Sequence, residues 1–289
     1  MLRSPAVAGY FYEATPEALK RQVEGFIRRG TAKRKAIGIL VPHAGLIYSG
    51  AVAGAVYSSV EIPDTVVLVG PNHTGLGEGI SLMAGGSWET PLGTVEIDEA
   101  LASSILSQSR RIHEDSVAHL REHSLEVQLP FIQYFKKKFK IVPIQMLDTR
   151  LETCLEVGKA IAAAIKVGGT GPGDRAQPGD QSGISNAKKA VTNVLIVASS
   201  DMSHYERAER AKEKDSKAIH SILNLDPAGL YRVVRDYEIT MCGYGPAVAM
   251  LSAAKILGAT SAELIKYSNS GETSGDYDKV VGYAGILIM

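Results

Sequence analysis

Three histidines of this 289-residue chain share one placement, because each lies in a short polar segment that follows an apolar run of strand length. The runs and their histidines are 36–41 with His43, 65–69 with His73, and 193–198 with His204. Ligands of open α/β sheets bind at the carboxyl ends of the strands. If the three strands are parallel neighbours, the imidazoles gather at one edge of the sheet, and we expect a binding site there.

A cysteine before a predicted helix adds a sulfur atom to this set. Cys242 precedes Pro246, which suits the first position of a helix over 246–257. A helix N-terminus lowers the pKa of a thiol from about 8.5 into the range of roughly 3.5–7.5, so we expect Cys242 to be the reactive cysteine. Cys154 falls on the apolar stripe of a predicted helix over 151–166, and we expect it to be buried and inert.

Neutral imidazoles and a thiolate are ligands of transition metals. Two histidines with one anionic ligand and open positions are typical of non-haem iron oxygenases. Zinc accepts two histidines, a cysteine and water, and copper stays open as well. A cysteine hydrolase is the competing interpretation, in which Cys242 attacks the substrate and His204, oriented by Asp201, takes the proton. That mechanism leaves two further histidines without a function, so the metal site is favoured.

Strand-like and helix-like segments alternate along the chain. The predicted strands are 36–41, 65–69, 80–83, 140–145, 193–198, 263–267 and 280–288. The predicted helices are 16–29, 50–59, 99–109, 125–138, 151–166, 207–223 and 246–257. This alternation predicts an α/β sandwich with a central mixed, largely parallel sheet flanked by helices. The segment 168–187 is rich in glycine and proline, and we interpret it as a surface loop within a single domain over 1–289.

Composition excludes several classes of protein. The 31 lysines and arginines balance the 31 aspartates and glutamates, whereas proteins that bind nucleic-acid backbones usually carry a basic surplus. No apolar run approaches the ~18 residues that span a bilayer, so we expect no membrane segment. The first residues do not resemble a signal peptide, and two cysteines cannot form a disulfide framework. We therefore expect a cytoplasmic protein.

At the motifs that carry these residues, the chain resembles the Memo-like family over nearly its whole length. The shared motifs are RSPAVAGYFY at 3–12, VPHAG at 41–45 with Tyr48 and Gly50, GPNH at 70–73, WETPLG at 88–93, EHSLE at 122–126, SSDMSH at 199–204, CG at 242–243, GDY at 275–277 and VGY at 281–283. The chain departs from the family pattern at Glu13, where many relatives have proline, and in the loop 168–187. Both departures lie outside the proposed site.

The resemblance implies a fold similar to that of the class III extradiol dioxygenases, which cleave catechol-like rings with non-haem iron. It implies that His43, His73 and Cys242 are the metal-binding trio. Asp201 and His204 match the remaining pocket residues, with His204 at the place of the acid/base histidine of those dioxygenases. A cysteine stands where they carry a glutamate ligand, so ring cleavage does not follow from the resemblance.

The resemblance also implies two functions that the residues leave open. One is a redox protein that binds iron, or alternatively copper, with zinc also able to bind, and acts on a small anionic or aromatic substrate. The other is a non-catalytic module that binds a phosphotyrosine peptide or another anion. Prokaryotic members are associated with a radical-SAM protein of the same system. We expect four further residues to line the pocket or support its ligands: Tyr48, Asn72, Trp88 and His123.

Overall fold

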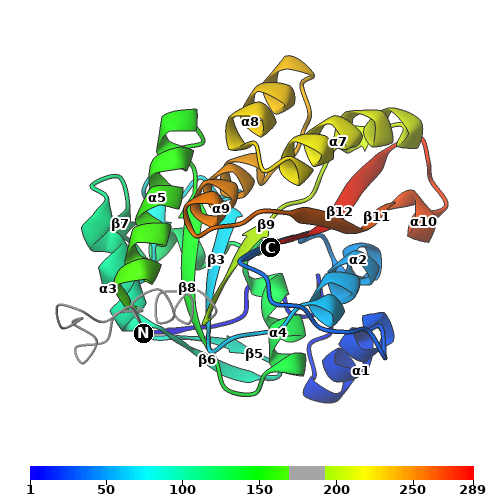
Figure 1. Ribbon diagram of the computed structural model, residues 1–289. Helices are drawn as coiled ribbons and strands as arrows, with labels where there is room; N and C mark the ends of the chain where they lie inside the picture. Colours follow the sequence, from blue (N-terminus) through cyan, green and yellow to red (C-terminus); the bar gives the residue numbers. More distant parts are fainter. Residues whose placement is uncertain (169–192) are drawn as a thin grey trace.

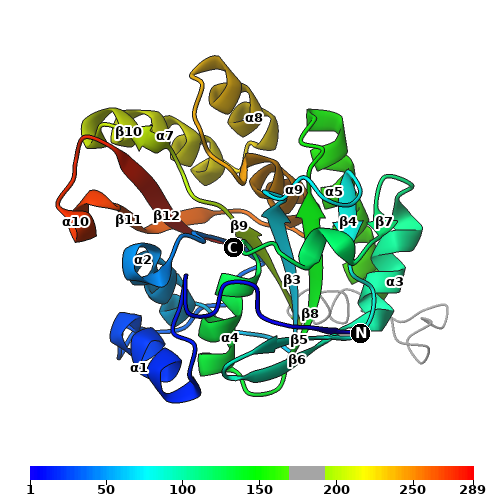
Figure 2. The same cartoon turned by 180° about the vertical axis from the view of Figure 1, so that it is seen from behind.

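The computed structural model describes residues 1–168 and 193–289. These residues form one large mixed sheet with helices on both faces (Figures 1 and 2). The predicted α/β fold with a largely parallel sheet is therefore confirmed. Most of the predicted loop 168–187 lies outside the described residues. Within the described residues, no helix combines the length and the hydropathy needed to cross a bilayer.

The strands of the described residues lie close to their predicted positions, and several short ones join them. They are β1 (Leu2–Arg3), β2 (Gly38–Val41), β3 (Thr65–Pro71), β4 (Ile80–Leu82), β5 (Ser87–Thr90), β6 (Gly93–Ile97), β7 (His113–Glu114), β8 (Lys140–Met146), β9 (Val194–Ser199), β10 (His204–Glu206), β11 (Ala262–Asn269) and β12 (Val280–Ile288). The main path across the sheet is β1-β5-β6-β8-β3-β9-β2-β12-β10, with β11 beside β12 and β4 beside β8.

The strands that carry the three histidine segments are parallel neighbours, which is the condition that the expected binding site requires. Strand β9 pairs in parallel with β3 on one side and with β2 on the other. The central strands are almost continuously apolar and buried, which is typical of a parallel sheet covered on both faces. Their register places Val41 beside Ser199 and Val69 beside Ala198, so the three strands end at the same edge.

Two helical layers cover the sheet. The helices are α1 (Pro16–Phe26), α2 (Leu46–Ser59), α3 (Glu99–Gln108), α4 (Leu129–Phe135), α5 (Leu151–Gly168), α7 (Ala208–Leu223), α8 (Pro227–Asp236), α9 (Tyr244–Ile256) and α10 (Gly271–Ser274), with 3₁₀ helices η1 (Val117–His119) and η2 (Glu126–Gln128). Helices α1, α2 and α4 pack together on one face, and α3, α5, α8 and α9 pack together on the other (Figure 1). Helix α7 contacts α8, β11 and β12.

Several helical segments differ from their predictions, among them α1, which ends at Phe26, and α2, which begins at Leu46. The helix predicted over 125–138 is shortened to η2 and α4, and the Glu126 side chain at its start lies in a buried polar network. Helix α9 begins at Tyr244, so Pro246 is its third residue and not its first. Helix α8 was not predicted, although its start carries a readable signal: Asp226 accepts a hydrogen bond from the Gly229 amide at 2.8 Å.

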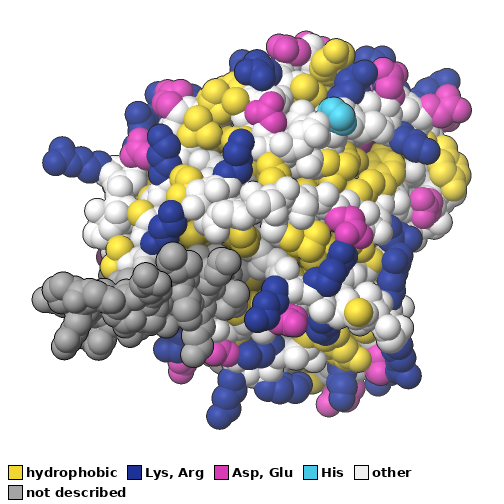
Figure 3. All heavy atoms as spheres, viewed as in Figure 1, with side chains coloured by type: hydrophobic (Ala, Val, Ile, Leu, Met, Phe, Trp, Pro, Cys, Tyr) yellow, Lys and Arg dark blue, Asp and Glu magenta, His cyan; other side chains and the backbone are white. Residues whose placement is uncertain are grey.

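The outer surface carries mixed charge. Lysine and arginine side chains lie among aspartate and glutamate side chains across the face seen in Figure 3. Apolar side chains are scattered between them. On this face, the pattern agrees with the zero formal net charge of the chain.

Candidate metal centre

Three imidazole rings meet beyond the carboxyl ends of β2 and β3. His43 lies two positions after the end of β2, and His73 lies two positions after the end of β3. His123 joins them from the segment before η2. The ring centroids are 5.2 Å apart for His43 and His73, 5.5 Å for His43 and His123, and 4.7 Å for His73 and His123. One ligand atom of each ring lies within 4.8 Å of the others.

The membership of this cluster differs from the expectation in one residue. We expected His123 to have only a supporting role, whereas in the structure it lies beside His43 and His73 as a third potential ligand. Its ring also contacts Phe11 at 4.7 Å between centroids. The charged residues around His123 in the sequence are typical of the exposed start of a helix, so the sequence did not predict this placement.

Cys242 lies beside the histidine cluster and contacts His43. The Cys242 Sγ atom is 3.2 Å from His43 Nε2. The neighbouring glycine makes this approach possible: a Cβ atom on Gly243 would collide with the Ser199 carbonyl oxygen and lie 2.5 Å from the Ser200 Cβ atom. The Gly243 amide also donates to Ser200 Oγ at 2.9 Å. Glycine at this position therefore lets the cysteine loop press against the end of β9.

The expected thiolate character of Cys242 is wrong for the metal-free protein. Burial raises the pKa of the Cys242 thiol, and the nearby charge of Asp201 raises it further. The thiol lies before the N-terminus of α9, but desolvation of the charged form outweighs the effect of the helix there. The predicted burial of Cys154 is confirmed, and burial raises its pKa to about 12.

His43 is the most buried histidine of the cluster, with 2% of its surface exposed. Burial lowers its pKa well below the ordinary value, and the other histidines of the site add to this effect. Its backbone amide donates to Asp201 Oδ1 at 2.8 Å, and the Ala44 amide donates to the same oxygen at 3.3 Å. A neutral imidazole in a fixed loop is the form that binds a metal ion.

Glu122 holds the other two histidines. Its carboxylate lies 3.0 Å from His73 Nδ1 and 3.3 Å from His123 Nδ1. It also accepts hydrogen bonds from the amides of His73, His123 and Ser124. Burial alone raises the pKa of Glu122, but the hydrogen bonds from His73 and the Ser124 amide prevail and lower it to about 2. A carboxylate behind a histidine is the usual partner of a metal-binding imidazole.

His204 lies at the same edge of the sheet, with partners that differ from the expected ones. Its backbone amide donates to Thr240 Oγ1 at 2.7 Å, and its Nδ1 lies 2.8 Å from the Thr240 carbonyl oxygen. A carbonyl oxygen only accepts, so Nδ1 carries a proton and donates it to this oxygen. Thr240 is therefore the hydrogen-bond partner that orients His204, in the place expected for Asp201. Asp201 instead fixes the loop of His43, and burial raises its pKa.

The remaining predicted residues take different places. Asn72 shapes the loop of His73, because its Oδ1 accepts from the Thr74 and Gly75 amides at 3.0 and 3.1 Å. Tyr48 lies in the first turn of α2 and is 37% exposed. Trp88 is fully buried, with its ring under the Arg3 guanidinium at 4.1 Å, so it supports the site only at a distance.

A buried ion pair lies behind the site, and the sequence did not predict it. Arg3 and Glu126 are 1% and 0% exposed, and Arg3 Nη1 lies 2.7 Å from Glu126 Oε2. Arg3 also donates to the carbonyl oxygens of His119 and Glu122, at 2.6 and 2.7 Å. Tyr12 donates to Glu126 Oε1 at 2.5 Å. These contacts tie the N-terminal segment to the loop that presents Glu122 and His123.

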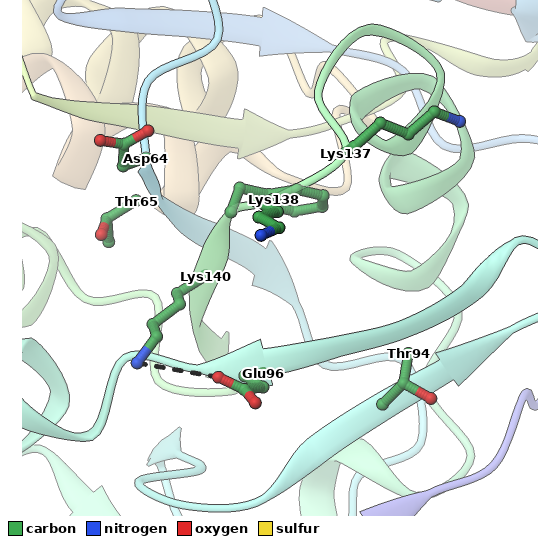
Figure 4. Close-up of a pocket in the computed structure, with 8 residues that line it drawn as sticks. Asp64, Thr65, Thr94, Glu96, Lys137, Lys138 and Lys140 are labelled. Atoms are coloured by element: carbon green, nitrogen blue, oxygen red, sulfur yellow. Dashed lines mark ion pairs between the residues drawn. The ribbon is translucent and has the colours of Figure 1, made fainter.

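A hollow with a volume of about 550 Å³ lies at the opposite ends of the strands, away from the histidine cluster. Lys140 faces Glu96 across it at 3.8 Å (Figure 4). At its rim, Asp64 pairs with Lys136 at 2.8 Å. Among the described residues, its lining includes neither histidine nor cysteine. The charges largely compensate one another, so the histidine cluster remains the candidate for chemistry.

Comparison with known proteins identifies the family to which this chain is similar. The sequence model of the family described as Memo-like protein matches residues 3–169 and 181–287. A MEMO1 family protein of Methanothermobacter thermautotrophicus is 43% identical, with 98% of this chain and 99% of that protein covered. A MEMO1 family protein of Aquifex aeolicus is 44% identical, with 100% and 99% covered.

A solved structure shares the fold alone. An uncharacterized protein from Escherichia coli K12 aligns with a TM-score of 0.50 and 13% identity, and the alignment covers 88% of this chain and 100% of that one. The family assignment rests instead on the sequence matches, which run from end to end. The chain belongs to the Memo-like protein family.

Proposed function

We propose that this protein holds a redox-active transition metal, iron or copper, through His43, His73 and Cys242. The observation that supports the proposal is the cluster of His43, His73 and His123 beyond the ends of neighbouring parallel strands, with the Cys242 thiol in contact with His43. Imidazole and thiolate suit iron, copper and zinc. An ion with open positions there would supply electron transfer to, or polarisation of, a bound small molecule.

The donor spacing supports the fit of an ion. Nitrogen and sulfur ligands at roughly 2.1 and 2.3 Å from one ion stand about 3.4 Å apart when the angle between them is about 100°. The 3.2 Å between His43 Nε2 and Cys242 Sγ is close to that separation. His123 lies within 4.8 Å of His43 and His73 and faces the same space, where it is suited to contact the substrate.

The remaining residues of the site suit a small anionic or aromatic substrate. The Nδ1 atom of His204 donates to the Thr240 carbonyl oxygen, which leaves Nε2 as the ring atom that would pass a proton to or from a substrate. Tyr48, partly exposed at the start of α2, offers an aromatic surface. Loop amides beside the N-terminus of α9 favour a negative charge on the substrate.

Metal analysis of protein purified without oxygen tests the proposal. We expect stoichiometric iron or copper in the wild type, and strong loss of metal in His43→Ala and Cys242→Ser. His113→Ala is the matched control, because His113 is exposed on β7 away from the cluster. Equal metal in the wild type and in His43→Ala would contradict the proposal.

The same variants separate a metal protein from a non-catalytic binding module. A module of that kind would bind a phosphotyrosine peptide without any metal, through its histidines and the amides at the N-terminus of α9. Peptide binding by metal-free protein, lost in His204→Ala and kept in His43→Ala, would favour this alternative. Binding that requires metal would favour the proposed centre.

A further inference from the structure

A buried polar network lies behind His43 on the side away from Cys242. The Ser199 side chain is the centre of this network, with Oγ 2.9 Å from His43 Nδ1. The Gln128 Nε2 atom donates to the same oxygen at 2.9 Å. Ser199 Oγ itself donates to the Ser124 carbonyl oxygen at 2.6 Å. Ser199 and Gln128 are both fully buried, so every polar atom of the network depends on its protein partners.

The orientation of the Gln128 amide follows from its other contacts. The Tyr57 hydroxyl donates to Gln128 Oε1 at 3.0 Å. Gln128 Nε2 donates to the Pro42 carbonyl oxygen at 3.0 Å, and this oxygen can only accept. The amide therefore presents its NH₂ group, and not its oxygen, to Ser199.

Counting hydrogens then assigns the tautomer of His43. A serine hydroxyl has one hydrogen and two acceptor positions. The hydrogen of Ser199 goes to the Ser124 carbonyl, because that oxygen has no hydrogen to give. One acceptor position takes the Gln128 NH₂ group. The atom of His43 that faces the remaining position is Nδ1, and it must donate.

We propose that Ser199, oriented by Gln128, is a positioning residue that holds His43 in its Nδ1–H tautomer. The free lone pair of His43 is then on Nε2, which faces Cys242 Sγ. Glu122 has the same effect on His73, because its carboxylate accepts from Nδ1 at 3.0 Å. Two different acceptors thus turn the two imidazoles the same way, with Nε2 toward the shared space.

The tautomer is a property of the metal-free chain, while its benefit to metal affinity rests on the proposed function. An imidazole held with a bare Nε2 binds an ion without rearranging its proton. Loss of the group behind a metal-binding histidine typically lowers metal affinity by roughly 10–100-fold. The two parts of the inference can be measured separately.

The first measurement uses metal-free wild-type protein and nitrogen-15 NMR of the histidine rings. We expect His43 to carry its hydrogen on Nδ1 and to have an unprotonated Nε2. The Nε2–H tautomer, or an even mixture, would overturn the inference. This measurement needs no variant, so it decides even if a buried serine proves essential for folding.

The second measurement compares Ser199→Ala with Ser81→Ala, in which another fully buried serine, bonded to Asp115, is removed far from His43. For Ser199→Ala we expect mixed tautomers of His43 and a Zn²⁺ affinity roughly 10–100-fold weaker in competition with a chelator. Ser81→Ala should keep the wild-type tautomer and affinity.

Wild-type tautomer and affinity in a folded Ser199→Ala would overturn the positioning role. The failure of the proposed function would look different: wild-type protein would bind no metal while His43 still carried its hydrogen on Nδ1.

Discussion

At the scale of single residues, two buried carboxylates, Glu122 and Glu126, hold different parts of the site in place. Glu122 faces the histidines and accepts hydrogen bonds from His73. Glu126 faces away from them and pairs with Arg3. A buried charge is tolerated only when it is paired and hydrogen-bonded, and both carboxylates satisfy this condition. The two carboxylates therefore fix the loop that carries His123 from two sides. Sequence patterns would place such charged side chains at the surface.

Breaking the Arg3–Glu126 pair should cost much stability. For Arg3→Met we expect the free energy of unfolding to fall by about 3–5 kcal/mol, because the variant leaves the buried Glu126 carboxylate without its cation. Urea unfolding measures this change. Arg34→Met is the control, because the Arg34–Glu263 pair lies at the surface and should contribute at most about 1 kcal/mol. Similar losses in both variants would contradict the burial argument.

The two cysteines should differ in reactivity. Cys242 is partly exposed and Cys154 is fully buried, so iodoacetamide should label Cys242 first in metal-free folded protein. The reaction should still be slower than that of an unstructured thiol, because burial raises the pKa of Cys242. Peptide mass spectrometry over time checks both points, with labelling in urea as the reference. Earlier labelling of Cys154 would refute the assigned burial.

At the scale of elements, close packing of α5 against α9 sets the base of the cysteine loop. Gly158 on α5 lies against the backbone of α9, where an added Cβ atom would collide with the Ala249 carbonyl oxygen and lie 2.6 Å from the Ser252 Cβ atom. Helix α9 begins two residues after Cys242. The position of Cys242 therefore depends on how closely these two helices approach.

Gly158→Ala should separate the two helices. We expect a loss of about 1–3 kcal/mol of stability, because the extra methyl group meets backbone atoms that cannot rotate away. Gly25→Ala on α1 is the matched control: nothing lies within 4 Å of its added Cβ atom, and alanine should stabilise that helix by roughly 0.5–1 kcal/mol. Thermal and urea unfolding distinguish the two. A neutral Gly158→Ala would disprove the close contact.

At the scale of the whole molecule, the candidate centre exists only in the folded chain. His43 and His73 follow β2 and β3, His123 precedes η2, and Cys242 precedes α9. No short segment of the chain therefore contains all four residues. A ligand that binds the folded state alone stabilises it in proportion to the logarithm of its concentration. Metal binding and global folding are therefore coupled in this protein.

Zinc should raise the thermal stability of the metal-free wild type. At a free concentration 100 times the dissociation constant, we expect about 2.7 kcal/mol of added stability. Differential scanning calorimetry measures the effect, which should disappear in His43→Ala and persist in His113→Ala. A shift of equal size in His43→Ala would mean that the ion binds elsewhere.

The sequence by itself determined the α/β class and the strand ends that carry His43 and His73. Apolar runs of strand length, followed by glycine, proline and asparagine, report local backbone preference, which survives in almost any tertiary context. The central strands are buried on both faces, so their sequences are almost continuously hydrophobic. This pattern also predicted a largely parallel sheet.

Only the tertiary structure decided which groups meet. His123 entered the cluster because Glu122 and the distant Arg3 hold its loop, and His204 took Thr240 as its partner in place of Asp201. Burial raised the pKa of Cys242 against the expected effect of the helix. Hydrogen-bond partners and desolvation depend on atoms far apart in the chain, and local sequence patterns carry no information about them.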